Sequence, residues 1–205
     1  MPSKPVLNVA LVGYAFMGRA HSNAYRQVNH FFPELPYQVV PKVLIGRSAG
    51  PLQAAAEQLG WEEWSTDLAA VLKRDDIHLV DVSTPNDSHV ALSIAALKAG
   101  KHVLTEKPLA LNAKQGRTLL EVARTAKTRD GKPVRTGLWH NYRRAPAVST
   151  LASLIHDGRI GEVRHVRAVY LQDWLLDESC PATWRMTAKA CGSGAHGDLN
   201  AHLID

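Results

Sequence analysis

The chain has 205 residues and a net charge of +5, with 45% hydrophobic and 21% charged residues. This length suits one good-sized domain, or one domain and part of another, and the composition is typical of a globular protein. Two cysteines, Cys180 and Cys191, exclude a disulfide-rich scaffold, and no apolar run is long enough to cross a bilayer. The first apolar run is short and ends at Gly13, which is unlike a signal peptide, so we expect a cytoplasmic protein.

Part of the positive charge lies in residues 124–144, which carry seven arginine and lysine side chains. A cluster of this kind can form a nucleic-acid patch. We interpret it instead as a solvated helix end and loop, and expect no nucleic-acid partner.

The first predicted elements are a strand at residues 8–12, a glycine turn and a helix at residues 18–31. Gly13 permits a tight turn and a close backbone approach to a pyrophosphate, and Gly18 lets the helix pack close to the strand. The start of the helix offers free N–H groups to phosphates. Ala15 replaces the middle glycine of the dinucleotide fingerprint, which is tolerable only if the backbone there does not need a positive φ. An ordinary strand-to-helix turn is the alternative.

The elements that follow alternate between strand and helix. We predict strands at residues 39–45, 79–83, 102–105 and 133–138, and a short strand or turn at 61–64. Pro41 cannot donate a ladder hydrogen bond, so only residues 42–45 of the second strand should pair well. Helices are predicted at residues 51–59, 67–73, 87–99 and 112–127. The alternation predicts an α/β fold with a doubly wound parallel sheet, the Rossmann fold, in residues 1–140, whose ligands bind at the carboxyl ends of the strands.

The pattern changes after residue 140. A helix is predicted at residues 146–157, an alternating strand at 162–171, and a second helix from Asp198 to Asp205. One strand and two helical segments cannot bury a core of their own. We therefore expect residues 141–205 to be an incomplete α+β unit, and the family resemblance of the motifs that follow implies that it is the N-terminal part of a substrate domain.

Three motifs together resemble the Gfo/Idh/MocA family of sugar and polyol dehydrogenases. They are the glycine turn, the sequence T-E-K-P at residues 105–108, and the sequence G-D-L-N-A-H at residues 197–202. The segments at residues 13–22, 84–86, 141–144 and 172–174 resemble a bacterial subgroup that includes levoglucosan dehydrogenase. The resemblance implies a chain that ends within the catalytic helix, before an open antiparallel sheet that usually forms the oligomer interface. A homo-oligomer is therefore expected for the full-length protein.

Oxidising a secondary alcohol requires a base for the hydroxyl proton and a positive group beside the developing alkoxide. By resemblance, Lys107, Asp198 and His202 match the catalytic residues of the family. Lys107 can stabilise the alkoxide or relay a proton, and His202 is the natural general base. Asp198 can orient His202 or bind a substrate hydroxyl, because residues four apart share one helix face. By spacing alone, a capping aspartate with an incidental histidine remains the alternative.

We expect NAD or NADP to bind at the strand ends, through Gly13, Tyr14, Ala15, Phe16, Met17, Gly18, Arg47, Ser48, Thr84, Pro85, Asn86, His89, Glu106 and Lys107. The end of the second strand lacks the acidic residue that would accept the ribose 2′-OH of NAD. Arg47 could pair with a 2′-phosphate or stack on adenine, which favours NADP, whereas relatives in the resembling subgroup include NAD users. Trp184 and Arg185 resemble a family pair near the substrate.

A metal site is a further alternative, because His196, Asp198 and His202 offer two imidazoles and a carboxylate. All three lie within seven consecutive residues, and His196 sits in a glycine turn, so we expect no metal. The leading hypothesis is an NAD(P)-dependent dehydrogenase of a sugar, anhydrosugar or cyclitol. The alternatives are a catalytically incomplete dinucleotide-binding fragment and an NAD(P)-sensing module. The sequence does not identify the sugar or polyol.

Overall fold

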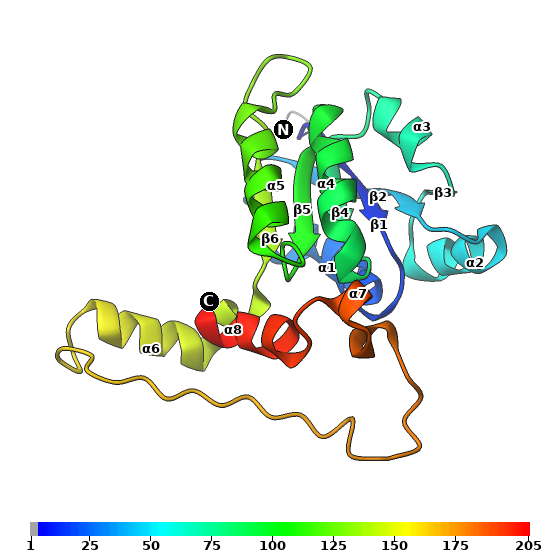
Figure 1. The fold of residues 1–205 in the computed structure, drawn as a ribbon. Helices are drawn as coiled ribbons and strands as arrows, with labels where there is room; N and C mark the ends of the chain where they lie inside the picture. The colour runs from blue at the N-terminus through cyan, green and yellow to red at the C-terminus, as the bar shows by residue number, and fades with distance from the viewer. Residues whose placement is uncertain (1–3) are drawn as a thin grey trace.

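A six-stranded parallel sheet forms the centre of the computed structural model, which describes residues 4–205 (Figure 1). Its strands are β1 Val6–Val12, β2 Gln38–Ile45, β3 Glu63–Ser65, β4 Leu79–Val82, β5 His102–Glu106 and β6 Thr136–Trp139. Their spatial order is β3-β2-β1-β4-β5-β6, with parallel pairing throughout. This is the Rossmann order, in which the winding reverses between β1 and β4 and leaves a crevice at the carboxyl ends of the strands.

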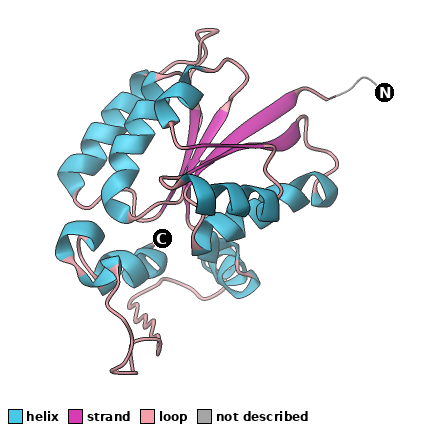
Figure 2. Cartoon of the chain, turned by 90° about the vertical axis from the view of Figure 1, so that its right-hand side faces the viewer, coloured by secondary structure: helices cyan, strands magenta, loops and turns pink. Residues whose placement is uncertain are grey.

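Helices cover both faces of the sheet (Figure 2). One face packs against α1 Phe16–Phe31 and α2 Ala49–Leu59, and the other packs against α3 Leu68–Lys73, α4 His89–Lys98 and α5 Ala113–Thr125. Three more helices follow the sheet, α6 Pro146–His156, α7 Ala188–Cys191 and α8 Ala201–Ile204. Within residues 4–205, no helix is both long and apolar enough to cross a membrane.

Strand β1 shows why the sheet is buried on both sides. Ala10 and Val12 belong to the apolar cluster under α4 and α5, whereas Val9 and Leu11 belong to the cluster under α1 and α2. Consecutive residues therefore face opposite helical layers, and all four are buried. This is the continuous apolar run expected of a parallel strand, and the predicted doubly wound fold is confirmed.

Several boundaries differ from those predicted. Strand β2 runs through Pro41, which lies opposite Val9, and the register shifts between Val9 and Ala10. On the other side of β2, strand β3 pairs only with residues 43–45 of β2. The ladder between β2 and β3 therefore requires no hydrogen bond from the backbone nitrogen of Pro41. Helix α2 begins at Ala49 rather than at Pro51, because a proline in the first helical turn loses no internal hydrogen bond.

The strand predicted at residues 162–171 is wrong. The segment has no regular structure, and Val166, Val169 and Leu171 are 76%, 65% and 84% exposed. In Figure 1 it forms the extended loop that runs below α6 and α8, away from the sheet. Its alternating pattern is suited to a strand, but within residues 4–205 no neighbouring strand pairs with it, and an isolated strand is unstable in water.

Candidate functional site

A cavity of about 710 Å³ opens beside the carboxyl edge of the sheet. Its wall combines the β1–α1 turn, the ends of β4 and β5, and the segment that follows β6. The lining residues are Ala15, Phe16, Met17, Ser83, Thr84, Pro85, Asn86, Glu106, Lys107, Asn141, Tyr142, Tyr170, Gln172, Trp174, Trp184, Arg185, Asp198, Leu199 and His202. Distant parts of the chain thus meet where a doubly wound sheet binds its ligands.

The glycine turn behind this cavity depends on both of its glycines. Gly13 has a φ of 103°, and a Cβ there would lie 2.9 Å from the Ser83 carbonyl oxygen. A Cβ on Gly18 would lie 2.3 Å from the Gly13 carbonyl oxygen, so α1 could not approach β1 as closely. Ala15 caps α1 with a φ of −74°, and its side chain makes no cap hydrogen bond. The backbone at Ala15 therefore tolerates a side chain, and the first N–H groups of α1 remain available for an anion.

An ion pair connects the end of β5 to the last segment of the chain. The Lys107 Nζ atom lies 2.7 Å from the Asp198 Oδ1 atom and donates to the Asp198 carbonyl oxygen at 2.8 Å. The Arg185 Nε atom lies 3.7 Å from the other carboxylate oxygen, and the guanidinium stacks 4.5 Å from the Trp184 ring centroid. The Asp198 carboxylate therefore holds two cationic side chains at the cavity wall.

His202 lies on the same wall and stacks on Tyr142, with ring centroids 4.1 Å apart and an interplanar angle of 21°. Its Nδ1 atom is buried and has no hydrogen-bond partner among the described residues. Burial lowers the pKa of His202, and the positive charge of Lys107 and the neighbouring His140 lower it further, against the opposing effect of Asp198. The ring is therefore neutral at neutral pH, which is the form that can accept a proton.

The backbone around Asp198 differs from the predicted α-helix. Residues His196–Asn200 form a π-helical turn, and α8 begins only at Ala201. Both Asp198 and His202 still line the cavity. Turns of this wide type occur often at functional sites, because they re-aim side chains relative to a regular helix.

Most of the residues predicted for the cofactor meet at the cavity. Gly13 and Gly18 form the turn, and eight others line the wall, namely Ala15, Phe16, Met17, Thr84, Pro85, Asn86, Glu106 and Lys107. The substrate candidates Trp184, Arg185 and Asp198 line it as well. Asn86 also donates to the Cys191 carbonyl oxygen at 3.1 Å, which attaches the last segment to the β4–α4 loop.

Besides the two glycines of the turn, four predicted residues lie outside the cavity wall. The Tyr14 ring covers Gly46, where a Cβ would lie 2.4 Å from the ring, and Arg47 and Ser48 are exposed at the end of β2. His89 is fully buried, with its ring nitrogens 2.8 Å from the carbonyl oxygens of Pro108 and Thr84. His89 therefore joins the loops that follow β4 and β5 instead of facing a ligand.

Sequence reasoning missed several residues of the wall, namely Ser83, Asn141, Tyr142, Tyr170, Gln172, Trp174 and Leu199. Residues 141–144 and 172–174 contributed to the family resemblance, and that signal could have placed Asn141, Tyr142, Gln172 and Trp174 near the site. Ser83 directly follows β4, at the carboxyl edge where ligands bind. No sequence signal singles out Tyr170 or Leu199.

The proposed metal ligands do not converge. His196 is exposed, and its Nδ1 atom lies 3.1 Å from the amide nitrogen of Asn200. Within residues 4–205, no group of three histidine, cysteine or acidic side chains is arranged to hold a metal ion.

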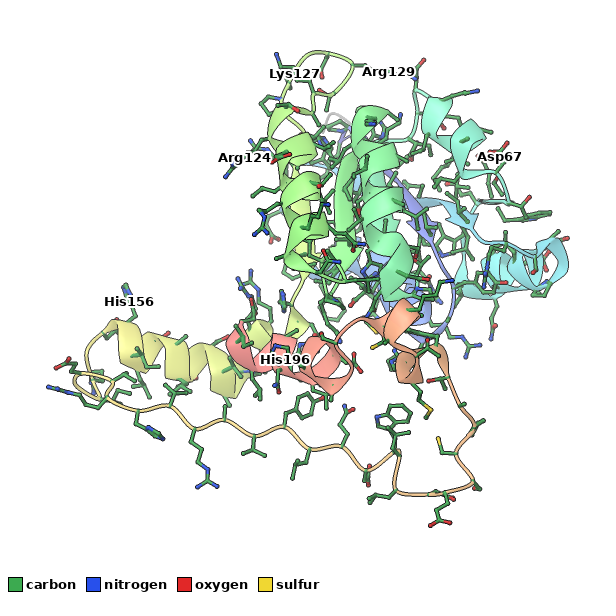
Figure 3. All side chains as sticks on the ribbon, in the orientation of Figure 1. Asp67, Arg124, Lys127, Arg129, His156 and His196 are labelled. Atoms are coloured by element: carbon green, nitrogen blue, oxygen red, sulfur yellow. The ribbon has the colours of Figure 1, made fainter. Side chains whose placement is uncertain are left out.

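The basic residues of the 124–144 segment lie apart from the last segment of the chain. Figure 3 shows that Arg124, Lys127 and Arg129 lie at the end of the sheet domain opposite to His196.

Two profiles of one protein family match most of this chain. Residues 7–130 match the Gfo/Idh/MocA profile described as an oxidoreductase family with an NAD-binding Rossmann fold, and residues 148–205 match the Gfo/Idh/MocA C-terminal domain. Levoglucosan dehydrogenase from Pseudarthrobacter phenanthrenivorans is 38% identical over 97% of this chain and 50% of its own length. The chain thus spans about half the length of this relative.

Solved structures of oxidoreductases are similar to this chain in both sequence and fold. An oxidoreductase domain protein from Kribbella flavida is 48% identical, with a TM-score of 0.91 over 98% of this chain and 52% of that protein. Levoglucosan dehydrogenase in complex with NADH and levoglucosan is 38% identical, with a TM-score of 0.90 over 97% of this chain and 52% of that protein.

Proposed function

This chain belongs to the Gfo/Idh/MocA oxidoreductase family, and on that premise we propose that its cavity binds NAD beside a sugar or anhydrosugar whose hydroxyl carbon is oxidised. One observation carries the proposal. The Lys107–Asp198 ion pair and the neutral His202 ring share one cavity with residues of the glycine turn, although Lys107 and His202 are 95 residues apart in the chain. Residues 1–140 would hold the cofactor, and residues 141–205 would supply one wall of the substrate site.

The residues of the turn fit a dinucleotide. The two glycines let the backbones of Gly13, Gly18 and Ser83 pack closely, where a Cβ would clash, and the uncapped start of α1 offers N–H donors to a pyrophosphate. Thr84, Pro85 and Asn86 would hold the nicotinamide end, because they follow β4 and reach the same cavity as Lys107. Bound NAD supplies a hydride acceptor, and every other part of the chemistry falls to the protein.

Three side chains would accept the proton, stabilise the developing charge and position the charged group. The neutral His202 ring accepts the proton of the substrate hydroxyl, because its lowered pKa keeps it unprotonated at neutral pH. The Lys107 ammonium stabilises the negative charge that develops on that oxygen. Asp198 positions the ammonium through the 2.7 Å ion pair.

The wall of the cavity supports a sugar as the proposed substrate. Tyr142, Trp174 and Trp184 provide flat apolar surfaces, while Gln172 and Arg185 provide hydrogen-bond donors. A sugar ring has apolar C–H faces and hydroxyl edges, so this mixture suits it. The similarity to levoglucosan dehydrogenase supports an anhydrosugar.

The test is an assay of NADH formation from NAD with levoglucosan, unmodified monosaccharides and cyclitols as substrates. We expect at least one anhydrosugar or sugar to reduce NAD, with a rate that saturates in both substrates. A folded protein that binds NADH but reduces NAD with none of them would favour a dinucleotide-binding role without catalysis.

Cofactor binding should depend on Gly13. We expect Gly13→Val to weaken NADH binding at least tenfold, because a β-branched side chain clashes with the Ser83 carbonyl and opposes the positive φ, which distorts the turn that would bind the pyrophosphate. NADH fluorescence titration measures the effect, and circular dichroism checks that the variant is folded. Gly50→Val is the matched control, because a Cβ on Gly50 meets no atom within 4 Å. Equal affinities of folded Gly13→Val and the control would contradict the assignment.

The choice between NAD and NADP should depend on Arg47. If the protein uses NADP, Arg47→Ala should weaken NADPH binding far more than NADH binding, because only NADPH loses a charge-assisted hydrogen bond. Parallel titrations of both cofactors measure the difference, with Arg124→Ala as a control at the opposite end of the domain. Equal losses for the two cofactors would mean that Arg47 only stacks on adenine.

A further inference from the structure

A buried charged cluster adjoins the cavity through Glu106, and the chemistry proposed above assigns it no role. His21 of α1 lies between two strands, with its Nδ1 atom 2.9 Å from Asp81 Oδ2 on β4 and its Nε2 atom 3.0 Å from Glu106 Oε1 on β5. The three side chains are 8%, 0% and 8% exposed. Burying carboxylates is costly unless they are paired, so the contacts must compensate each other.

The hydrogen bonds define the charge of the ring. The Tyr25 hydroxyl donates to Asp81 Oδ2 at 2.8 Å, and the Trp139 indole N–H donates to Asp81 Oδ1 at 3.0 Å. Asp81 therefore acts as an acceptor, and so does Glu106, which accepts from the backbone N–H of Lys107 at 3.2 Å. A ring that faces an ionised carboxylate with each nitrogen carries a proton on both.

The titration behaviour agrees with this geometry. Burial lowers the pKa of His21, but the hydrogen bonds and charges of Asp81 and Glu106 outweigh it and raise the pKa to about 9. The groups that face the ring are these two carboxylates, the nearby Tyr25 hydroxyl and the Trp139 ring, whose centroid is 5.0 Å away.

The cluster connects directly to the candidate catalytic lysine. The second oxygen of Glu106, Oε2, accepts a hydrogen bond from the backbone N–H of Lys107 at 3.2 Å. The Lys107 side chain then reaches Asp198 across the cavity. A continuous series of contacts thus runs from the His21 ring through Glu106 to the Lys107 ammonium.

We propose that His21 is a positioning residue whose doubly protonated ring fixes the Glu106 carboxylate, which in turn fixes the backbone of Lys107 so that its ammonium lies at the reacting oxygen. This inference rests on the proposed function of Lys107. A small displacement of a catalytic group can cost up to about a hundredfold in rate. The cluster therefore affects catalysis without touching substrate.

The test compares wild type with His21→Gln and with His30→Gln, a control at an exposed histidine of the same helix. Nitrogen NMR of the wild type should show both ring nitrogens of His21 protonated at pH 8. His21→Gln should shift the Lys107 amide resonance and lower kcat about tenfold, with NADH affinity unchanged. His30→Gln should change none of these. A neutral His21 ring at pH 8, or an unmoved Lys107 amide in folded His21→Gln, would overturn the proposal.

Glu106→Gln provides the second variant, because it keeps the side-chain shape if His21→Gln fails to fold. His21 should then lose its second proton at a lower pH than in the wild type, and an unchanged titration would overturn the proposal. The NMR readouts do not depend on turnover. If the wild type oxidises no sugar, the proposed function fails, while these resonances still decide the role of His21.

Discussion

His202→Ala is expected to lower the turnover number for sugar oxidation by about a hundredfold or more, which is the usual contribution of a general base. The ring lies in the cavity that holds Lys107 and Asp198, and its lowered pKa keeps it unprotonated, and so able to accept a proton, at neutral pH. NADH affinity should change little, because the turn that would bind the pyrophosphate is formed by other residues. Steady-state kinetics and NADH titration of the same variant measure both effects.

The matched control is His196→Ala, which removes an exposed histidine from the same segment. Its turnover should stay close to that of the wild type. The pH dependence adds a second check, because the lowered pKa of His202 means that activity persists below the usual histidine range before acid protonates the base. Near-normal turnover of His202→Ala at neutral pH would exclude this base and favour Lys107.

Asp81→Ala is expected to lower the free energy of unfolding by about 3–5 kcal/mol, the usual cost of removing one partner of a buried ion pair. Asp81 is fully buried and accepts hydrogen bonds from His21, Tyr25 and Trp139. Without it, a charged ring and two neutral donors lose their acceptor in the core. Urea unfolding measures the change, and Asp87→Ala at an exposed aspartate is the control. A loss below about 1 kcal/mol, within the range of a typical substitution, would mean that the cluster is not ionised as described.

The same cluster predicts a pH dependence of stability. The folded-state pKa of His21 is about 9, above the ordinary histidine value of 6.5, so the folded protein holds this proton more tightly than the unfolded chain. The stabilisation is therefore complete below about pH 6.5 and is lost as the pH rises through 9. His21→Gln should not show this loss between pH 6.5 and 9.

Much of the fold could be predicted because its signals are local. Apolar runs such as β1 are bounded by glycine, and the alternation with amphipathic helices implies a parallel sheet with its ligand edge at the carboxyl ends of the strands. The helix predicted from residue 112 begins there with a local cap, since the Asn112 side chain accepts from the Gln115 N–H. These features depend on neighbours within a few residues.

The remainder depends on distant partners. The alternating segment at residues 162–171 has the sequence pattern of a paired strand, yet it forms no strand pairing within residues 4–205. His89 follows a strand end as a ligand-binding residue would, but contacts with Thr84 and Pro108 bury it. The role of His21 depends on Asp81 and Glu106, which are 60 and 85 residues away. Periodicity and spacing carry no information about such contacts.

Binding of NADH to the 205-residue chain is the most direct test of a nicotinamide cofactor site beside Lys107, Asp198 and His202. It needs no knowledge of the sugar and no turnover. Titration followed by NADH fluorescence should give a saturable signal that NAD displaces, together with a shift of the Lys107 amide resonance beside the cavity. A folded chain that gives no saturable signal with either NADH or NADPH would contradict the assignment of this cavity to a dinucleotide.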